Sequence, residues 1–114
     1  MDDCIFCKII NSEIPSNKVY EDDDVLAFKD INPQMPVHII VIPKKHIKSI
    51  ADLTIEDETL IGKIFTAINK ITKDLNISED GFRVISNCGE NAGQTVQHLH
   101  FHILGGEKMS EKII

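Results

Sequence analysis

The clearest periodic signal in the chain is an apolar stripe that recurs at steps of three and four residues. Its members are Leu60, Ile61, Ile64, Phe65, Ile68, Ile71 and Leu75. This spacing places all of them on one face of an α-helix, so it predicts a long amphipathic helix whose apolar face contacts a core or an interface. Thr54 is the predicted N-cap, acidic residues fill the first turn, and the helix is expected to end near Asn76.

The remaining apolar segments are short and rich in β-branched residues, and they predict strands. The predicted strands are residues 18–21, 25–28, 38–43, 82–86 and 97–104. The first two form a hairpin around an acidic turn, and Pro43 closes the third. A short helix is predicted over residues 6–11. This order of elements favours an α+β fold with an antiparallel sheet.

The length of 114 residues, without repeats or low-complexity segments, predicts a single domain over residues 1–114. Apolar residues make up 42% of the chain, but no apolar run approaches the roughly 20 residues that cross a bilayer. The start, Met1-Asp2-Asp3, lacks the basic residues of a signal peptide. Three cysteines, an odd number, do not form a disulfide framework. We therefore expect a cytoplasmic protein that does not bind membranes.

The formal net charge of -6 argues against broad binding to nucleic acid, which requires clustered Lys and Arg side chains. A small anionic ligand is compatible with this charge. Local hydrogen-bond donors and dipoles must then hold it, because the overall field repels it slightly. The chemistry therefore has to come from local groups.

Three of the five histidines lie in the segment His98-Leu99-His100-Phe101-His102. Successive side chains of a strand point to opposite faces, so the three histidines are expected to share one face. Residues two apart in a strand are roughly 6 to 7 Å apart, which lets one phosphate or one metal ion touch more than one imidazole. Imidazole can act as nucleophile, donor or ligand. A catalytic zinc site with three histidine ligands and an open water position is therefore an alternative to covalent catalysis.

The segment from His98 to Leu104 fits the pattern His-φ-His-φ-His-φ-φ, where φ is hydrophobic, at every position. Residues 4–10, 28–33, 38–46 and 104–106 extend the match. On these residues the chain resembles the histidine triad superfamily, and within it the HINT branch. The resemblance implies a five-stranded antiparallel sheet with one long and one short helix, and a homodimer with a continuous ten-stranded sheet. It also implies hydrolysis of purine nucleoside 5′-phosphoramidates.

The resemblance gives catalytic roles to individual histidines. His100 matches the nucleophile, whose neutral imidazole attacks phosphorus to form a nucleotidyl-histidine intermediate. Its other nitrogen would donate a proton to a main-chain carbonyl near His98. His102 and His38 match positions that hydrogen-bond the phosphate oxygens, where they can offset charge that grows in the transition state.

Further residues match positions that bind the substrate. Asn87 and Thr95 match contacts to the phosphate or the leaving group, although many relatives carry serine at the position of Thr95. Asp30 matches an acid that accepts hydrogen bonds from the ribose hydroxyls, and an Asx-type turn is its alternative role. The apolar slot for the base is matched by Phe6, Ile9, Phe28 and Ile31, for which core packing is the alternative.

Cys4 and Cys7 form a C-x-x-C pair, which by itself is weak evidence for a metal site. Members of the HINT branch that carry this pair have a four-ligand metal site. Its other two ligands match His46 and His98 of this chain. The resemblance therefore implies a structural Cys2His2 zinc site, with no metal needed for the chemistry. Cys88 has no partner in this scheme.

Alternatives to phosphoramidate hydrolysis stay open at this level. A protein of the same fold can be a dinucleoside polyphosphate hydrolase, or a nucleotidyl transferase if another acceptor competes with water. A metal-dependent hydrolase would bind zinc through His100 and His102. A nucleotide-responsive binding module would act through a protein partner. The tail, residues 107–114, departs from the family pattern and leaves the preference among leaving groups open.

Overall fold

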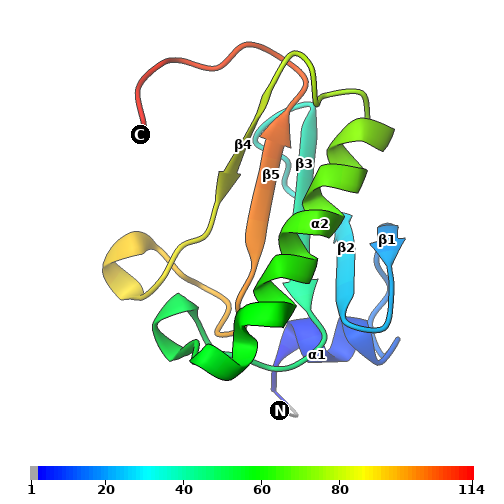
Figure 1. Cartoon of the computed structure of the whole chain (residues 1–114), viewed down its shortest axis with the longest axis vertical. Helices are drawn as coiled ribbons and strands as arrows, with labels where there is room; N and C mark the ends of the chain where they lie inside the picture. The colour runs from blue at the N-terminus through cyan, green and yellow to red at the C-terminus, as the bar shows by residue number, and fades with distance from the viewer. Residues whose placement is uncertain (1–2) are drawn as a thin grey trace.

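The computed structural model describes residues 3–114, which form a five-stranded sheet with two α-helices (Figure 1). The elements are α1 (Ile5–Ile10), β1 (Lys18–Glu21), β2 (Val25–Lys29), β3 (Val37–Pro43), α2 (Glu58–Asp74), β4 (Phe82–Ile85) and β5 (Phe101–Gly105). The strand order is β1-β2-β3-β5-β4, and every neighbouring pair is antiparallel. The predicted α+β fold, with one long and one short helix, is confirmed.

Helix α2 crosses one face of the sheet and starts later than the sequence predicts (Figure 1). The carboxylate of Asp57 accepts a hydrogen bond from the main-chain N–H of Thr54 at 3.0 Å, and this capping box closes a 3-10 turn over Ile55–Asp57. Such turns are frequent at helix N-termini, so the α-helix begins only at Glu58. Neither helix within residues 3–114 has the length and hydrophobicity needed to cross a bilayer.

The sheet separates two apolar clusters, one under each helix. The cluster under α2 contains Val25, Ala27, Ile39, Val41, Ile64, Ala67, Ile68, Ile71, Leu99, Phe101 and Ile103. The cluster on the α1 face contains Phe6, Ile9, Leu26, Phe28, Ile40 and Ile42. Consecutive residues of β2 and β3 alternate between the two clusters, as the period of two in a strand requires.

The last strand is shorter than predicted, because its hydrogen-bonded ladder with β3 begins only at Phe101. Before that point the main-chain N–H of Leu99 leaves the sheet and donates to the carbonyl of Ile47 at 2.6 Å. The alternation of faces nevertheless continues upstream. Leu99 packs under α2, whereas His98 and His100 lie against the ring of Phe6 on the α1 face.

Candidate functional site

Histidines from two neighbouring strands gather on the α1 face of the sheet. His38 lies on β3 and His102 on β5, and their ring centroids are 5.1 Å apart. His100 lies just before β5, with its ring centroid 5.2 Å from that of His102 and 5.1 Å from that of Phe6. The fold therefore brings the second and third histidines of the run together with His38, although 62 residues separate His38 from His100 in the sequence.

The imidazole of His100 is oriented by the main chain. Its Nδ1 lies 2.7 Å from the carbonyl oxygen of His98, and since a carbonyl only accepts, Nδ1 carries the proton. In the neutral ring, Nε2 then keeps its lone pair. The hydroxyl of Ser86, just after β4, donates to the carbonyl of His100 at 2.7 Å and ties this segment to the neighbouring strand. A buried, oriented imidazole with a free lone pair can act as a nucleophile.

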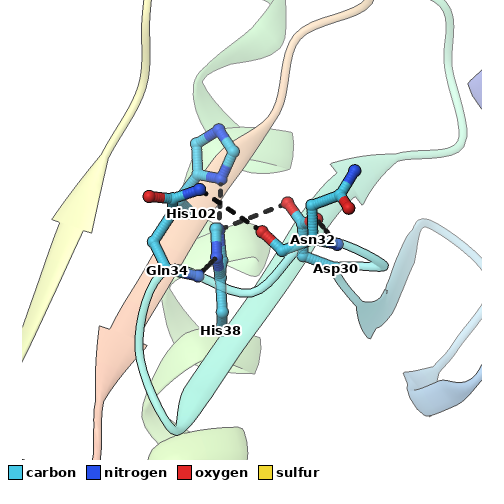
Figure 2. A network of polar contacts seen from close by, with 5 residues as sticks. All are labelled: Asp30, Asn32, Gln34, His38 and His102. Atoms are coloured by element: carbon cyan, nitrogen blue, oxygen red, sulfur yellow. Dashed lines mark hydrogen bonds and ion pairs between the residues drawn. The ribbon is translucent and has the colours of Figure 1, made fainter.

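A second chain of hydrogen bonds passes through His38, as Figure 2 shows. The main-chain N–H of Gln34 donates to His38 Nδ1 at 3.0 Å. His38 Nε2 lies 2.8 Å from His102 Nδ1 and 3.4 Å from Asp30 Oδ2. The side chain of His38 is 4% exposed, and both of its ring nitrogens have partners inside the protein.

Burial favours the neutral form of these imidazoles. Burial lowers the pKa of His38, although the carboxylate of Asp30 acts in the opposite direction. Burial also lowers the pKa of His102, and the neighbouring His100 and His38 lower it further. Burial is also the main reason why the pKa of His98 is lowered. A neutral imidazole has one donor and one acceptor nitrogen, so a fixed partner on one nitrogen decides the role of the other.

An apolar cavity of about 360 Å³ opens between α1 and β2, and every residue predicted for the base slot lines it. These residues are Phe6, Ile9, Phe28 and Ile31. Three of them are buried, whereas Ile31 is 92% exposed and stands at the rim. Asp30 lines the same cavity. Its Oδ1 accepts the main-chain N–H of Asn32 at 2.7 Å, so the Asx-type turn considered as its alternative role is present as well.

Asn87 and Thr95, which match phosphate or leaving-group positions, have different surroundings. The side-chain amide of Asn87 donates to the carbonyl of Ala92 at 2.6 Å, and this bond closes the loop that follows β4. Thr95 is exposed and lines a cavity of about 310 Å³ together with Cys4 and His46. Within residues 3–114, neither side chain is hydrogen-bonded to the histidine run.

A cluster of four potential metal ligands lies next to the histidine run and consists of Cys4, Cys7, His46 and His98. Their ligand atoms lie within 4.8 Å of one another. The two Nδ1 atoms are 3.1 Å apart, and Cys4 Sγ is 3.4 Å from His98 Nδ1. Cys7 Sγ is 3.4 Å from His46 Nδ1. Tetrahedral zinc needs ligand atoms about 3.3 to 3.8 Å apart, so a small closure or opening of this cluster would accommodate it.

The chemistry of this cluster also suits a metal ion. His98 Nε2 donates to the carbonyl of Pro43 at 2.9 Å, which leaves the lone pair on Nδ1, the atom that faces the cysteines. Histidines that bind metals usually donate their other N–H to such an acceptor. Burial, assisted by the neighbouring Cys4, raises the pKa of the Cys7 thiol to about 11. A metal ion that binds here would therefore have to displace a thiol proton.

Asp30, His38 and His102 also bring three potential ligand atoms within 4.8 Å, but their hydrogen bonds do not suit a metal ion. Because His38 Nδ1 accepts the N–H of Gln34, the ring proton must sit on Nε2, the atom that would have to bind the ion. Metal binding there would require either an imidazolate or the loss of that hydrogen bond. The geometry favours a donor role for His38, and it argues against a metal ion held by Asp30, His38 and His102 together.

A family model described as HIT domain matches residues 11–109. The chain belongs to the HIT domain family. This HIT protein is 45% identical over 108 residues to the purine nucleoside phosphoramidase of Escherichia coli strain K12, covering 95% of this chain and 91% of the relative. It is 47% identical over 105 residues to protein HitA of Neisseria gonorrhoeae, covering 92% and 97%. A solved HIT family hydrolase from Clostridium thermocellum is 49% identical with a TM-score of 0.98, covering 100% of this chain and 99% of that chain.

In this HIT protein, sequence reasoning missed several polar groups around the histidines and the cavity. Gln34 contributes through its main-chain N–H and Ser86 through its hydroxyl, and neither has a signal in the sequence pattern. Ser16 was missed as well: it lines the apolar cavity, and its Oγ is buried without a hydrogen-bond partner in the described part of the chain. Every residue except proline has a main-chain N–H, and serine is common in turns, so position in the sequence alone does not reveal these contacts.

Proposed function

We propose that this HIT protein is a purine nucleoside phosphoramidase of the HINT branch, which cleaves the P–N bond of nucleoside 5′-phosphoramidates through covalent histidine catalysis. Its main support is the hydrogen bond from His100 Nδ1 to the carbonyl of His98, because this bond leaves Nε2 with the lone pair that attacks phosphorus. Similarity to the purine nucleoside phosphoramidase of Escherichia coli adds to this support.

The proposed reaction has two displacements at phosphorus. In the first, His100 Nε2 forms a bond to phosphorus while the P–N bond breaks, and the nitrogen leaves as an amine after it takes a proton from solvent. In the second, water attacks phosphorus and releases a proton to solvent, the bond from phosphorus to His100 Nε2 breaks, and the nucleoside monophosphate leaves. His102 lies beside His100 and is the proposed hydrogen-bond donor to the phosphate oxygens or to the leaving nitrogen.

The apolar cavity beside the histidines is the proposed site for the nucleoside. The rings of Phe6 and Phe28 pack edge to face, with their centroids 5.6 Å apart. They give one end of the cavity a rigid aromatic wall suited to a base. Asp30 lies on the same cavity and on the hydrogen-bond chain of His38, so its carboxylate connects the proposed ribose position with the histidines. Asn87 and Thr95 are proposed contacts of the phosphate or leaving group.

The test is release of AMP from adenosine 5′-phosphoramidate by the purified protein beside the His100→Ala variant, with zinc content equal in both samples. We expect turnover by the original chain and a loss of roughly 1,000-fold or more in the variant, since removal of a covalent nucleophile has effects of this size. AMP should bind both proteins with similar affinity. Equal turnover in both samples would overturn the assignment of His100.

The same experiment separates the alternatives. Diadenosine polyphosphates offered in parallel identify a polyphosphate hydrolase, and an added amine or alcohol acceptor identifies a nucleotidyl transferase. Nucleotide binding without release of AMP from any substrate would favour the binding module. Loss of turnover on chelation, with the fold intact, would favour the metal-dependent hydrolase.

We also propose that Cys4, Cys7, His46 and His98 hold a structural zinc ion. The proximity of the four ligand atoms and the free lone pair of His98 Nδ1 support this assignment. Bound zinc would cross-link the helix α1 segment to the residues just before His100. Equilibrium dialysis followed by elemental analysis should find one zinc ion for each chain.

A homodimer with a ten-stranded sheet is the proposed assembly. Strand β4 is at the edge of the sheet, where it pairs with β5 alone, so its other edge can pair with a second copy. Phe65 of α2 is 48% exposed and gives an apolar surface for such a contact. Light scattering during gel filtration should give twice the chain mass of 12.8 kDa.

A further inference from the structure

We infer that His38 is a positioning residue that fixes the tautomer of His102, and that the main-chain amide of Gln34 sets this order. The inference departs from the role that family resemblance gives to His38, which is a direct contact with phosphate. It rests on the proposed function only for its catalytic consequence, because the hydrogen-bond order itself is independent of the substrate.

The order of donors and acceptors begins at the hydrogen bond between Gln34 and His38, because the direction of this bond is fixed. A main-chain N–H can only donate, so His38 Nδ1 must accept at 3.0 Å and carries no proton. An imidazole must keep a proton on at least one nitrogen, so the proton of His38 sits on Nε2. Gln34 belongs to a short turn that begins at Asp30, in which the Asp30 carboxylate accepts the main-chain N–H of Asn32 and the Gln34 side-chain amide donates to the carbonyl of Asn32 at 3.5 Å (Figure 2).

The order then passes from His38 to His102. With a proton on His38 Nε2, the 2.8 Å contact has one possible direction, in which Nε2–H donates to His102 Nδ1. The reverse direction would leave His38 without a ring proton, as an imidazolate. Asp30 Oδ2 lies on the same side of His38 but at the longer distance of 3.4 Å, so His102 is the closer acceptor.

The consequence is a defined tautomer of His102. With Nδ1 as acceptor, neutral His102 carries its proton on Nε2, where it can donate a hydrogen bond to a phosphate oxygen or to the leaving nitrogen. His100 has the opposite tautomer, with its proton on Nδ1 and its lone pair on Nε2. Two main-chain groups therefore make neighbouring histidines complementary: the His98 carbonyl makes His100 a nucleophile, and the Gln34 amide makes His102 a donor.

The same bonds keep His38 away from the phosphate. Its side chain is 4% exposed, and both nitrogens are occupied by Gln34 and His102. A phosphate contact would require His38 to give up its bond to His102. A role through His102 needs no such change.

Nitrogen-15 NMR of the imidazole rings in the zinc-loaded protein tests the order directly, because protonated and bare ring nitrogens have distinct chemical shifts. We expect protonated Nε2 in His38 and His102 and protonated Nδ1 in His100. A proton on Nδ1 of either His38 or His102 would overturn the inference. This measurement needs no substrate, so it remains decisive if the protein does not hydrolyse phosphoramidates.

Variants of His38 test the consequence for catalysis. In His38→Leu we expect mixed tautomers of His102, a kcat roughly tenfold lower, and an unchanged dissociation constant for AMP, because an ordered hydrogen-bond donor stabilises charge in the transition state. In His38→Gln a side-chain amide can replace the donor, so part of kcat and the Nε2–H form of His102 should return. If AMP binding instead weakens tenfold in His38→Leu while the His102 tautomer stays ordered, His38 is a phosphate ligand and the inference is wrong.

A pair of substitutions at Gln34 isolates the main-chain amide. Gln34→Ala and Gln34→Pro both remove the side chain, but only proline removes the N–H group. We expect ordered tautomers of His38 and His102 in the alanine variant and mixed tautomers in the proline variant. Identical spectra in two folded variants would overturn the role of the amide, and if the proline variant does not fold, the spectrum of the original chain still decides.

Discussion

Two clusters that each contain a pair of histidines lie on the same face of the sheet, and their hydrogen bonds favour opposite chemistry. The first cluster consists of Cys4, Cys7, His46 and His98. The second cluster consists of Asp30, His38 and His102. In both, the possible ligand atoms lie within 4.8 Å of one another. Distance between side chains therefore does not distinguish a metal site from a proton-donating site.

The main-chain partner of one histidine makes the difference. His98 donates its Nε2–H to the carbonyl of Pro43, so its other nitrogen offers a lone pair to a metal ion. His38 accepts the N–H of Gln34, so its other nitrogen offers a proton. A histidine thus becomes a ligand or a donor according to whether the backbone beside it presents a carbonyl or an amide.

Loss of one cysteine should have the largest effect and should be confined to the first cluster. We expect Cys7→Ala to lower zinc affinity by roughly 100-fold or more, since one of four ligands is lost. Competition with a chromophoric chelator measures the affinity. Cys88→Ala, a cysteine outside the cluster, and His102→Ala should each retain one zinc ion per chain. Loss of zinc in His102→Ala would show that the second cluster binds the metal instead.

Removal of zinc should lower stability more than it lowers activity. At a free zinc concentration 1,000 times the dissociation constant, binding contributes about 4 kcal/mol to the free energy of unfolding. Urea unfolding with excess zinc, compared with unfolding in a chelator, measures this difference. Chelated protein that is still folded should release AMP, and an inactive folded state would point to a catalytic metal.

Acid should destabilise the fold through the buried histidines. The folded-state pKa values of His38 and His102 lie below the ordinary value of about 6.5, so between these values the unfolded chain binds more protons. Their contribution to stability is complete above about pH 6.5 and is lost as the pH falls through the lowered pKa values. Calorimetry from pH 7.5 to 5 should show a falling Tm, and the fall should be smaller in His38→Gln. An equal fall in both proteins would contradict this cause.

The smallest expected effect concerns the two serines near the site. Ser86→Ala removes the hydrogen bond to the carbonyl of His100 and should cost about 1 kcal/mol of unfolding free energy. Ser16→Ala is the matched control, because its hydroxyl is buried without a partner in the described chain, and its removal should be neutral or slightly stabilising. Equal losses in both variants, measured by urea unfolding, would show that the Ser86 bond contributes nothing.

The sequence by itself determined the elements and the grouping of the histidine run. The apolar stripe predicted α2, the alternation from His98 to Ile103 predicted which side chains share a face, and the family pattern indicated the four potential metal ligands that the fold brings together. These features depend on residues a few positions apart, or on a motif, so their periodicity is readable in the chain.

Only the tertiary structure decided the roles of the individual ring nitrogens and the true limits of the elements. The start of β5 depends on Ile47, which takes the N–H of Leu99 out of the ladder. The tautomer of His102 depends on His38, 64 residues away in the chain, and through it on the amide of Gln34. A main-chain group is the same in every residue, so its use as donor or acceptor becomes specific only when the fold places a partner within hydrogen-bond distance.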